Sequence, residues 1–176
     1  YAATRLEDIA EAAKVTRGAV YHHFGSKAEL FAEIIDNADQ MGDRAIQRAI
    51  QEGGTFLEVV QRSLIYTLQM VHDDSQYQAA MALLVFNAGD SPDLLFMREK
   101  RMEHGLAAME QVVDYFRRAV AEGAVRAGLD PEIAARAFMA YQNGLHMLAL
   151  ASPGILEAEK HGKGIAEIFV QGIAPR

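Results

Sequence analysis

The residues with the clearest chemical capacity lie near the start of the chain. Arg17, Tyr21 and His22 occur within one short stretch, and Lys27 follows it. A guanidinium can donate two hydrogen bonds to guanine O6 and N7, whereas a tyrosine hydroxyl or a lysine ammonium can bind a phosphate. Gly18, beside Arg17, has no side chain and lets the backbone approach base edges. These residues predict contact with double-stranded DNA.

Two short helices joined by a tight turn must position these side chains. Thr4 and Glu7 form a capping-box pattern, which predicts a helix that begins at Thr4 and ends near Lys14. Thr16 is a suitable N-cap for a second helix over residues 17–23. This pattern predicts a helix-turn-helix, in which the second helix enters the major groove and the first supports it.

Apolar residues at helical spacing predict the small core that braces the second helix. This set consists of Ile9, Ala13, Val15, Val20 and Phe24. Ser26 and Glu29 form another capping-box pattern and predict a third, longer helix to about Ile50. The boundary between two parts of the chain is expected along this helix, with a DNA-binding head over residues 1–45 and a larger body over residues 46–176.

The body also reads as helical throughout, since Ala, Leu, Met, Glu and Gln dominate and no strand pattern is present. A proline-glycine loop is expected at residues 152–154. Helices are predicted over residues 55–72, 76–88, 91–122, 130–151 and 157–172. The predicted fold class is therefore all-α, with a helix-turn-helix head and a helical-bundle body.

Charge and composition limit the possible functions. The net charge is −7, but residues 1–28 carry four bases and three acids, whereas residues 29–176 carry thirteen bases and twenty-one acids. Nucleic-acid contact is therefore expected only at the head. The absence of cysteine excludes disulfides and thiolate metal sites. No apolar run approaches 18 residues and no signal peptide is visible, so a cytoplasmic protein without membrane contact is expected.

The run from Thr4 to Leu30, with its Tyr-x-His-Phe-x-x-Lys core, resembles the DNA-binding signature of the TetR family of transcriptional repressors. The resemblance implies that Lys27 touches the DNA backbone and that the second helix reads the major groove. Its implied contact residues are Thr16, Arg17, Gly18, Tyr21 and His22. In this family another helix normally precedes the match, and a glycine is most common where Lys14 stands.

The body resembles, over residues 95–130 and 137–145, the C-terminal domain of the multidrug-efflux repressors within that family. The resemblance implies a homodimer formed through the last two helices. It also implies a pocket for aromatic or amphipathic compounds, whose binding moves the two heads of the dimer apart and releases the operator. An efflux pump is then a candidate regulatory target.

Three polar residues on an otherwise apolar helix are candidates for that pocket, because buried polar groups need partners. Gln142 and His146 share one helix face, and Asn143 lies beside them. They either hydrogen-bond within the core or a dimer interface, or meet a ligand. Expected walls are Leu64, Leu68, Leu84, Phe86, Ala108 and Val112. Met139 is a further candidate, although core filling explains methionines equally well.

Other sites are less favoured. Adjacent His22 and His23 point about 100° apart on a helix, so they suit one metal ion poorly. Common hydrolase, phosphate-loop and zinc-protease motifs are absent, so no enzyme activity and no cofactor are predicted. An apolar stripe is expected either at a dimer interface or in the core of one chain. It comprises Leu145, Leu148, Leu150, Ile165, Ile168 and Phe169.

The sequence thus predicts a ligand-responsive repressor that binds a near-palindromic operator as a dimer and is released by a small hydrophobic or aromatic effector. Two alternatives stay open. One is a regulator of lipid or other metabolism with an acyl-type ligand. The other is a helical small-molecule-binding scaffold that does not bind DNA.

Overall fold

The computed structural model describes residues 3–87 and 95–175, and over these residues it contains helices and no strand. The predicted all-α fold class is confirmed. In chain order the elements are α1 (Leu6–Ala12), α2 (Arg17–His23), α3 (Lys27–Gln51), α4 (Phe56–Asp73), α5 (Ser75–Ala82), the π-helical turn η1 (Leu83–Asn87), α6 (Leu95–Ala121), α7 (Pro131–Ala151), α8 (Pro153–Leu156) and α9 (Ala158–Ile173).

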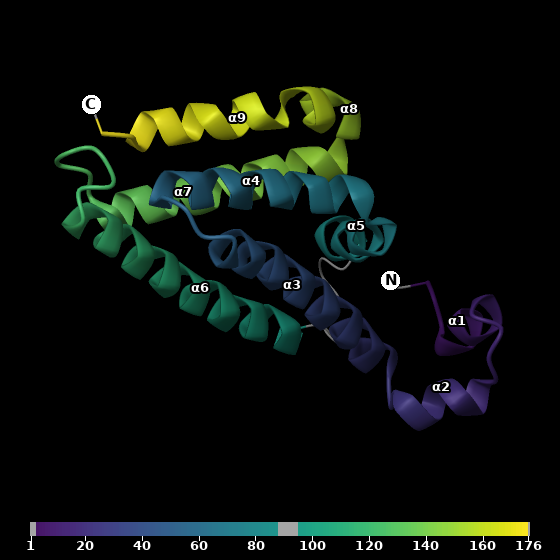
Figure 1. Cartoon of the computed structure of the whole chain (residues 1–176). Helices are drawn as coiled ribbons and strands as arrows, with labels where there is room; N and C mark the ends of the chain where they lie inside the picture. The colour runs from purple at the N-terminus through teal and green to yellow at the C-terminus, as the bar shows by residue number, and fades with distance from the viewer. Residues whose placement is uncertain (1–2, 88–94, 176) are drawn as a thin grey trace.

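The helices form a small head and a larger body (Figure 1). Helices α1 and α2 lie at one end of the molecule, and α3 leads from them into the body. There α4 packs against α3, α7 and α9, while α6 packs against α7. The long helix α3 passes without a break through the predicted boundary at residues 45 and 46. The division into two domains at that point stays a prediction.

Each part has its own apolar core. The body core surrounds Leu64 and Phe116, which are fully buried. The rings of Phe56, Phe116, Phe138 and Phe169 follow one another through this core, with successive ring centroids 5.1, 6.2 and 5.7 Å apart. The head core is separate, and a third small cluster forms where Phe31 and Ile35 of α3 meet η1.

Local capping signals place most helix ends, but the start of α1 was predicted wrongly. The helix begins at Leu6 and not at Thr4. The carboxylate of Asp8 accepts a hydrogen bond from the Arg5 backbone N–H at 2.8 Å. Glu7, the expected capping partner of Thr4, instead accepts a hydrogen bond from the Tyr21 hydroxyl at 2.8 Å. A contact with α2 therefore removes Glu7 from the cap.

Two further boundaries differ from the prediction. The expected loop at residues 152–154 is replaced by the short helix α8, which Glu157 separates from α9 with a left-handed backbone (φ 39°). The helix expected over residues 76–88 ends at Ala82 and continues as the π-turn η1. The expected helix start at Ser91 and Pro92 lies outside the described residues.

Arg62 of α4 fixes the end of α3 that lies inside the body. Its guanidinium donates to the Ala49 carbonyl at 2.9 Å and also to the Gly53 carbonyl. These oxygens belong to the last turn of α3 and the turn that follows it, where helix carbonyls have no partner within the helix. The positive charge also suits the negative end of the helix dipole. Arg62 therefore caps α3 from a neighbouring helix.

We predict that Arg62→Met lowers the free energy of unfolding by about 2–3 kcal/mol, because it keeps the alkyl stem but leaves two partly buried carbonyls without their charged donor. Urea unfolding followed by circular dichroism measures this difference. Arg117→Met is the matched control, since Arg117 forms exposed ion pairs with Asp114 of α6 and Glu132 of α7. A loss of equal size in both variants would contradict the capping role.

Candidate functional site

Helix α2 presents one face to the head core and the other to solvent. The Thr16 hydroxyl accepts a hydrogen bond from the Ala19 N–H at 3.1 Å, which confirms Thr16 as the N-cap. Val20 is buried against Leu6 and Ala10 of α1. With this side of α2 packed, the residues on both sides of Val20 in the sequence lie on the outer side of the helix.

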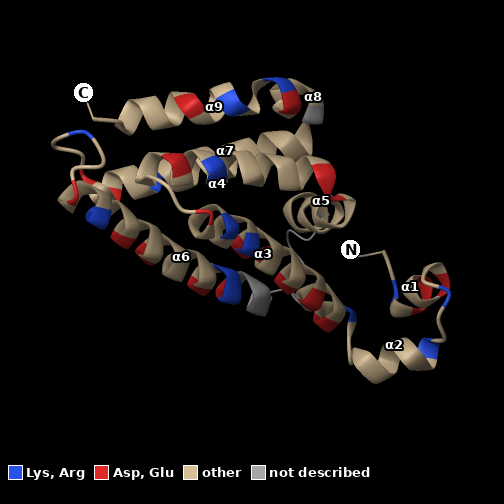
Figure 2. Ribbon diagram, viewed as in Figure 1, with Lys and Arg blue, Asp and Glu red and all other residues tan. Residues whose placement is uncertain are grey.

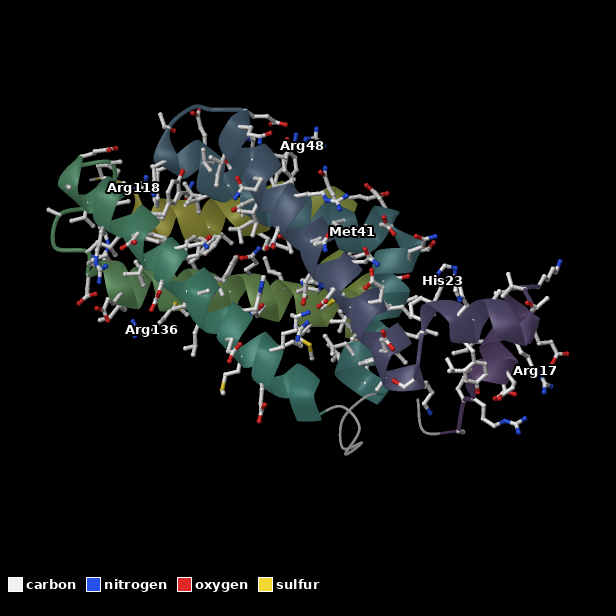
Figure 3. All side chains as sticks on the ribbon, turned by 90° about the horizontal axis from the view of Figure 1, so that it is seen from below. Arg17, His23, Met41, Arg48, Arg118 and Arg136 are labelled. Carbon is white, nitrogen blue, oxygen red and sulfur yellow. The ribbon has the colours of Figure 1, made fainter. Side chains whose placement is uncertain are left out.

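The predicted DNA-contacting residues of α2 share that outer face. Arg17, Gly18, Tyr21 and His22 are all exposed. Figure 3 shows Arg17 on the head, at the end of the molecule opposite Arg118 and Arg136 of the body. A Cβ at Gly18 would meet only the Thr16 hydroxyl oxygen, at 3.9 Å. Glycine is therefore not required at this position by packing within the chain, which leaves close approach to a ligand as a reason for its small size.

The head core differs in part from the predicted set. Val20 is buried, and Ile9 and Phe24 pack against it as expected. Ala13 and Val15, however, are exposed, and Leu6 and Ala10 occupy the core instead. The reason lies in the turn. Lys14 has a left-handed backbone (φ 56°), which directs the chain away from the core directly after α1. This is the position at which the family resemblance implied a glycine.

Two predicted phosphate-binding groups are hydrogen-bonded within the head. The Tyr21 hydroxyl donates to Glu7, and this hydrogen bond raises the pKa of Tyr21. A hydrogen bond from its own backbone N–H, together with the one from Tyr21, lowers the pKa of Glu7. The Lys27 ammonium donates to the Thr4 carbonyl at 2.8 Å. These bonds hold both side chains beside the exposed face of α2. Their contact with phosphate stays a prediction.

A second group of polar side chains lies in the middle of the body. Gln142 of α7 donates to the Thr67 hydroxyl of α4 at 2.9 Å, and Thr67 donates to the Ser63 carbonyl at 3.0 Å. One turn further along α7, the His146 Nε2 lies 3.1 Å from the Tyr77 hydroxyl of α5. Gln142 and His146 therefore share one face, as predicted, whereas Asn143 is exposed.

An ion pair adjoins the second of these contacts. Arg101 of α6 donates from one terminal nitrogen to both carboxylate oxygens of Asp39 of α3, each at 3.0 Å. Burial and the positive charge of Arg101 lower the pKa of His146. Burial and the negative charge of Asp39 raise the pKa of Tyr77. We call Tyr77, His146, Arg101 and Asp39 the polar cluster; it joins α3, α5, α6 and α7.

Sequence reasoning missed Thr67, Tyr77 and the Arg101–Asp39 pair. The sequence contains a pattern that points to Thr67, because Ser63 and Thr67 are polar residues four apart on the buried side of α4. No sequence pattern points to the ion pair, since its partners are 62 residues apart and both residue types are common on protein surfaces.

The predicted pocket walls occupy different environments. Leu64 and Leu68 are fully buried in the body core, where Leu84, Val112 and Met139 pack as half-buried neighbours. Ala108 is half-buried, and Phe86 is 52% exposed. Exposure of Phe86 does not fit a wall of a closed pocket. The ligand-binding role of the whole set stays a prediction.

Two adjoining cavities, of about 330 and 250 Å³, lie between α4 and the start of α9. Leu68, His72, Ala158 and Glu159 line both, and the His72 Nε2 lies 3.0 Å from the Glu159 carboxylate. Leu68 is the one predicted wall residue among their lining residues. These cavities therefore lie beside the predicted pocket and not within it.

Among residues 3–87 and 95–175, no three His, Asp or Glu side chains are grouped to hold a metal ion. Within the same residues, no helix combines the length and apolar character needed to cross a bilayer.

Sequence comparison places these features among known regulators. Residues 1–34 match a sequence model described as "Bacterial regulatory proteins, tetR family". The transcriptional regulator TtgR of Pseudomonas putida is 30% identical over 145 residues, which cover 82% of this chain and 69% of TtgR. The transcriptional regulator AcrR of Shigella flexneri is 23% identical over 169 residues, which cover 96% of this chain and 79% of AcrR.

Solved structures show the same architecture. NalD of Pseudomonas aeruginosa, the secondary repressor of the MexAB-OprM multidrug efflux pump, superposes with a TM-score of 0.81 at 25% identity, over 99% of this chain and 88% of NalD. SmeT in complex with triclosan superposes with a TM-score of 0.77 at 24% identity, over 98% of this chain and 83% of SmeT. The latter likeness concerns the fold alone.

We predict that His146 makes the protein less stable in mild acid. Because the pKa of His146 is lowered in the folded state, the unfolded chain binds a proton at a higher pH than the folded chain does. The free energy of unfolding should then fall as the pH drops below about 6.5. His146→Gln should flatten this decline between pH 7 and pH 5, as measured by urea unfolding.

The matched control for this experiment is His22→Gln, which changes an exposed ring on α2. This variant should show the same change in the free energy of unfolding with pH as the parent protein. If the parent and His146→Gln lose stability equally between pH 7 and pH 5, burial of His146 does not cause the pH dependence.

Proposed function

Because this chain belongs to the tetR family of bacterial regulatory proteins, we propose that it is a transcriptional repressor whose hold on operator DNA is released by a small hydrophobic or aromatic effector. It acts as a homodimer in the bacterial cytoplasm, by binding and without catalysis. The likeness to NalD, which represses an efflux pump, supports an efflux-pump gene as the target.

The exposed face of α2 carries this proposal. Arg17 and Gly18 follow the N-cap Thr16 at the start of α2, which is the part of a recognition helix that enters the major groove, and Tyr21 and His22 lie one turn further along its exposed face. Lys27 at the start of α3 adds a cation beside that face. With two heads in a dimer, the operator half-sites should be about 34–36 Å apart, and the operator should be near-palindromic.

The effector site is proposed among α4, α5, α6 and α7. Gln142 and His146 supply polar groups that now bond to Thr67 and Tyr77, and the surrounding leucines and methionines supply apolar surface. A few convergent polar groups in an apolar setting are typical of small-molecule sites. A ligand could replace these internal hydrogen bonds with its own. The predicted walls Leu64, Leu68, Leu84, Ala108, Val112 and Met139 complete the proposed site, whereas the predicted residues Phe86 and Asn143 are exposed and are left out of it.

Exposed apolar residues on α7 and α9 support a homodimer through these two helices. Leu148 is 43% exposed and Ile168 is 69% exposed. The remaining members of the predicted stripe, Leu145, Leu150, Ile165 and Phe169, pack against the core of their own chain. The stripe thus has an inner part and an outer part. The outer part fits a symmetric contact in which four helices from two chains pack together.

The function is tested by fluorescence anisotropy of the protein with DNA from upstream of its own gene, at two salt concentrations and with a panel of hydrophobic compounds. Binding that weakens with salt and is abolished by one compound is the expected result. Salt-dependent binding that no hydrophobic compound affects would overturn the effector class. Absence of DNA binding would favour the scaffold alternative.

We predict that Arg17→Ala lowers affinity for the operator by roughly 5- to 150-fold and relaxes sequence preference, because it removes a contact to base edges. Lys27→Ala should weaken binding to specific and to non-specific DNA by similar factors, because it removes a phosphate contact. It should also reduce the slope of log affinity against log salt concentration by about one. Arg117→Ala on α6 is the control. Equal effects of Arg17→Ala on all DNA sequences would contradict base reading.

We predict that Ile168→Glu shifts the protein from dimer to monomer, with a dissociation constant raised at least roughly tenfold, because a carboxylate would be buried without a partner. Sedimentation at several protein concentrations measures this change. Leu106→Glu on α6 replaces an apolar residue of similar exposure, 62%, outside the proposed interface. Dissociation in both variants, or in neither, would contradict an interface through α9.

A further inference from the structure

Two ion pairs and one histidine contact connect α6 to the middle of α3. Lys100 pairs with Asp36 and Arg101 with Asp39, and the His104 Nε2 lies 3.9 Å from the Asp43 carboxylate. In Figure 2, acidic residues follow this part of α3, and basic residues mark the first described turns of α6. We call these six residues the ionic seam.

The spacing of the seam fits a contact between two helix faces. Asp36, Asp39 and Asp43 recur three and four residues apart, so they lie on one side of α3. Their partners likewise fall within one turn of α6. Because the acids are on α3 and the basic residues are on α6, moving the two helices apart would lengthen all of these contacts together. The seam therefore favours a position in which these two helix faces stay close.

The two ends of α3 are held by different kinds of contact. At its body end, Arg62 and the hydrogen bond from Tyr66 to Glu52 fix α3 to α4. Nearer the head, Phe31 and Ile35 pack on η1. The seam lies between these two sites, on side chains that are 25–57% exposed. Exposed ion pairs are weak and are screened by salt. The seam is thus the part of the α3 contacts that changes most easily.

We propose that the ionic seam positions α3 against α6 and so sets where the head stands relative to the body. Arg101 is the member that links this role to the interior, because it belongs to both the seam and the polar cluster with Tyr77 and His146. A ligand that reorganises the polar cluster would alter the hold of Arg101 on Asp39. The biological consequence, a change in the spacing of two DNA-reading heads, rests on the proposed function.

A distance measurement between head and body tests the positioning role directly. The chain has no cysteine, so introduced cysteines are unique labelling sites. Glu11→Cys on α1 and Gln111→Cys on α6 lie on exposed positions. Spin labels at these sites report the distance by pulsed electron paramagnetic resonance, with labelled chains diluted in unlabelled chains. Neither DNA nor effector is present, so this test is independent of the repressor function.

The parent protein should give one narrow distance distribution. Asp39→Asn and Arg101→Gln should each broaden or shift this distribution. Loss of one exposed ion pair changes the ratio of the populations of two orientations of α3 relative to α6 by roughly 1.5- to 5-fold. The exchange Asp39→Arg with Arg101→Asp should restore the parent distribution. Asp114→Asn, which breaks an exposed pair within α6, should have no effect.

The salt dependence of the same distance distribution provides a second test. High salt should broaden the distribution of the parent protein. It should have a smaller effect on the variant that lacks both Asp39 and Arg101 charges, in which only the Lys100–Asp36 ion pair remains to be screened. If Asp39→Asn does not fold, Asp36→Asn, which breaks the more exposed pair with Lys100, should give a smaller shift in the same direction. Unchanged distributions in the single variants, or failure of the exchange to restore the parent distribution, would overturn the proposal.

Discussion

The continuity of α3 is the constraint on which the rest of the structure depends. This helix has 25 residues, so it spans about 37 Å and transmits a tilt at one end to the other. Its body end is fixed because Arg62 of α4 binds the carbonyls at the end of the helix. Its other end adjoins the head core through Leu30. The head therefore takes its position from α3, and contacts along α3 decide how far that position can change.

The body combines a rigid apolar core with a polar interior that can be rearranged. The aromatic series through Phe116 and Phe138 is close-packed and resists small displacements. Polar groups on α7 are costly to bury unless they have partners, and Thr67 and Tyr77 supply them. Removing one partner would be unfavourable, but exchanging it for a ligand group need not be. The polar interior is thus the natural place for a ligand to change helix positions.

Sequence reasoning succeeded where the controlling interaction is local and failed where it is tertiary. Thr16 and Asp130 place the starts of α2 and α7, because an N-cap needs only residues two or three positions away. The start of α1 was wrong because Glu7 binds Tyr21 of the next helix. In the candidate site, Gln142 and His146 were found from helical periodicity. Their partners on other helices follow from packing, which one amino-acid sequence does not reveal directly.

The position of α7 explains how the proposed parts could act together. Its exposed side carries Leu148, at the proposed dimer interface, and its inner side carries Gln142 and His146. In a dimer, α7 would be held close to the symmetry axis, so a ligand bound against its inner side would displace α5 and α6 more readily than α7. Both helices adjoin α3, through η1 and through the ionic seam. Arg62 anchors α3 at the end that lies farthest from the head. A small displacement of α3 at η1 or at the ionic seam therefore produces a larger displacement of the DNA-reading face of α2.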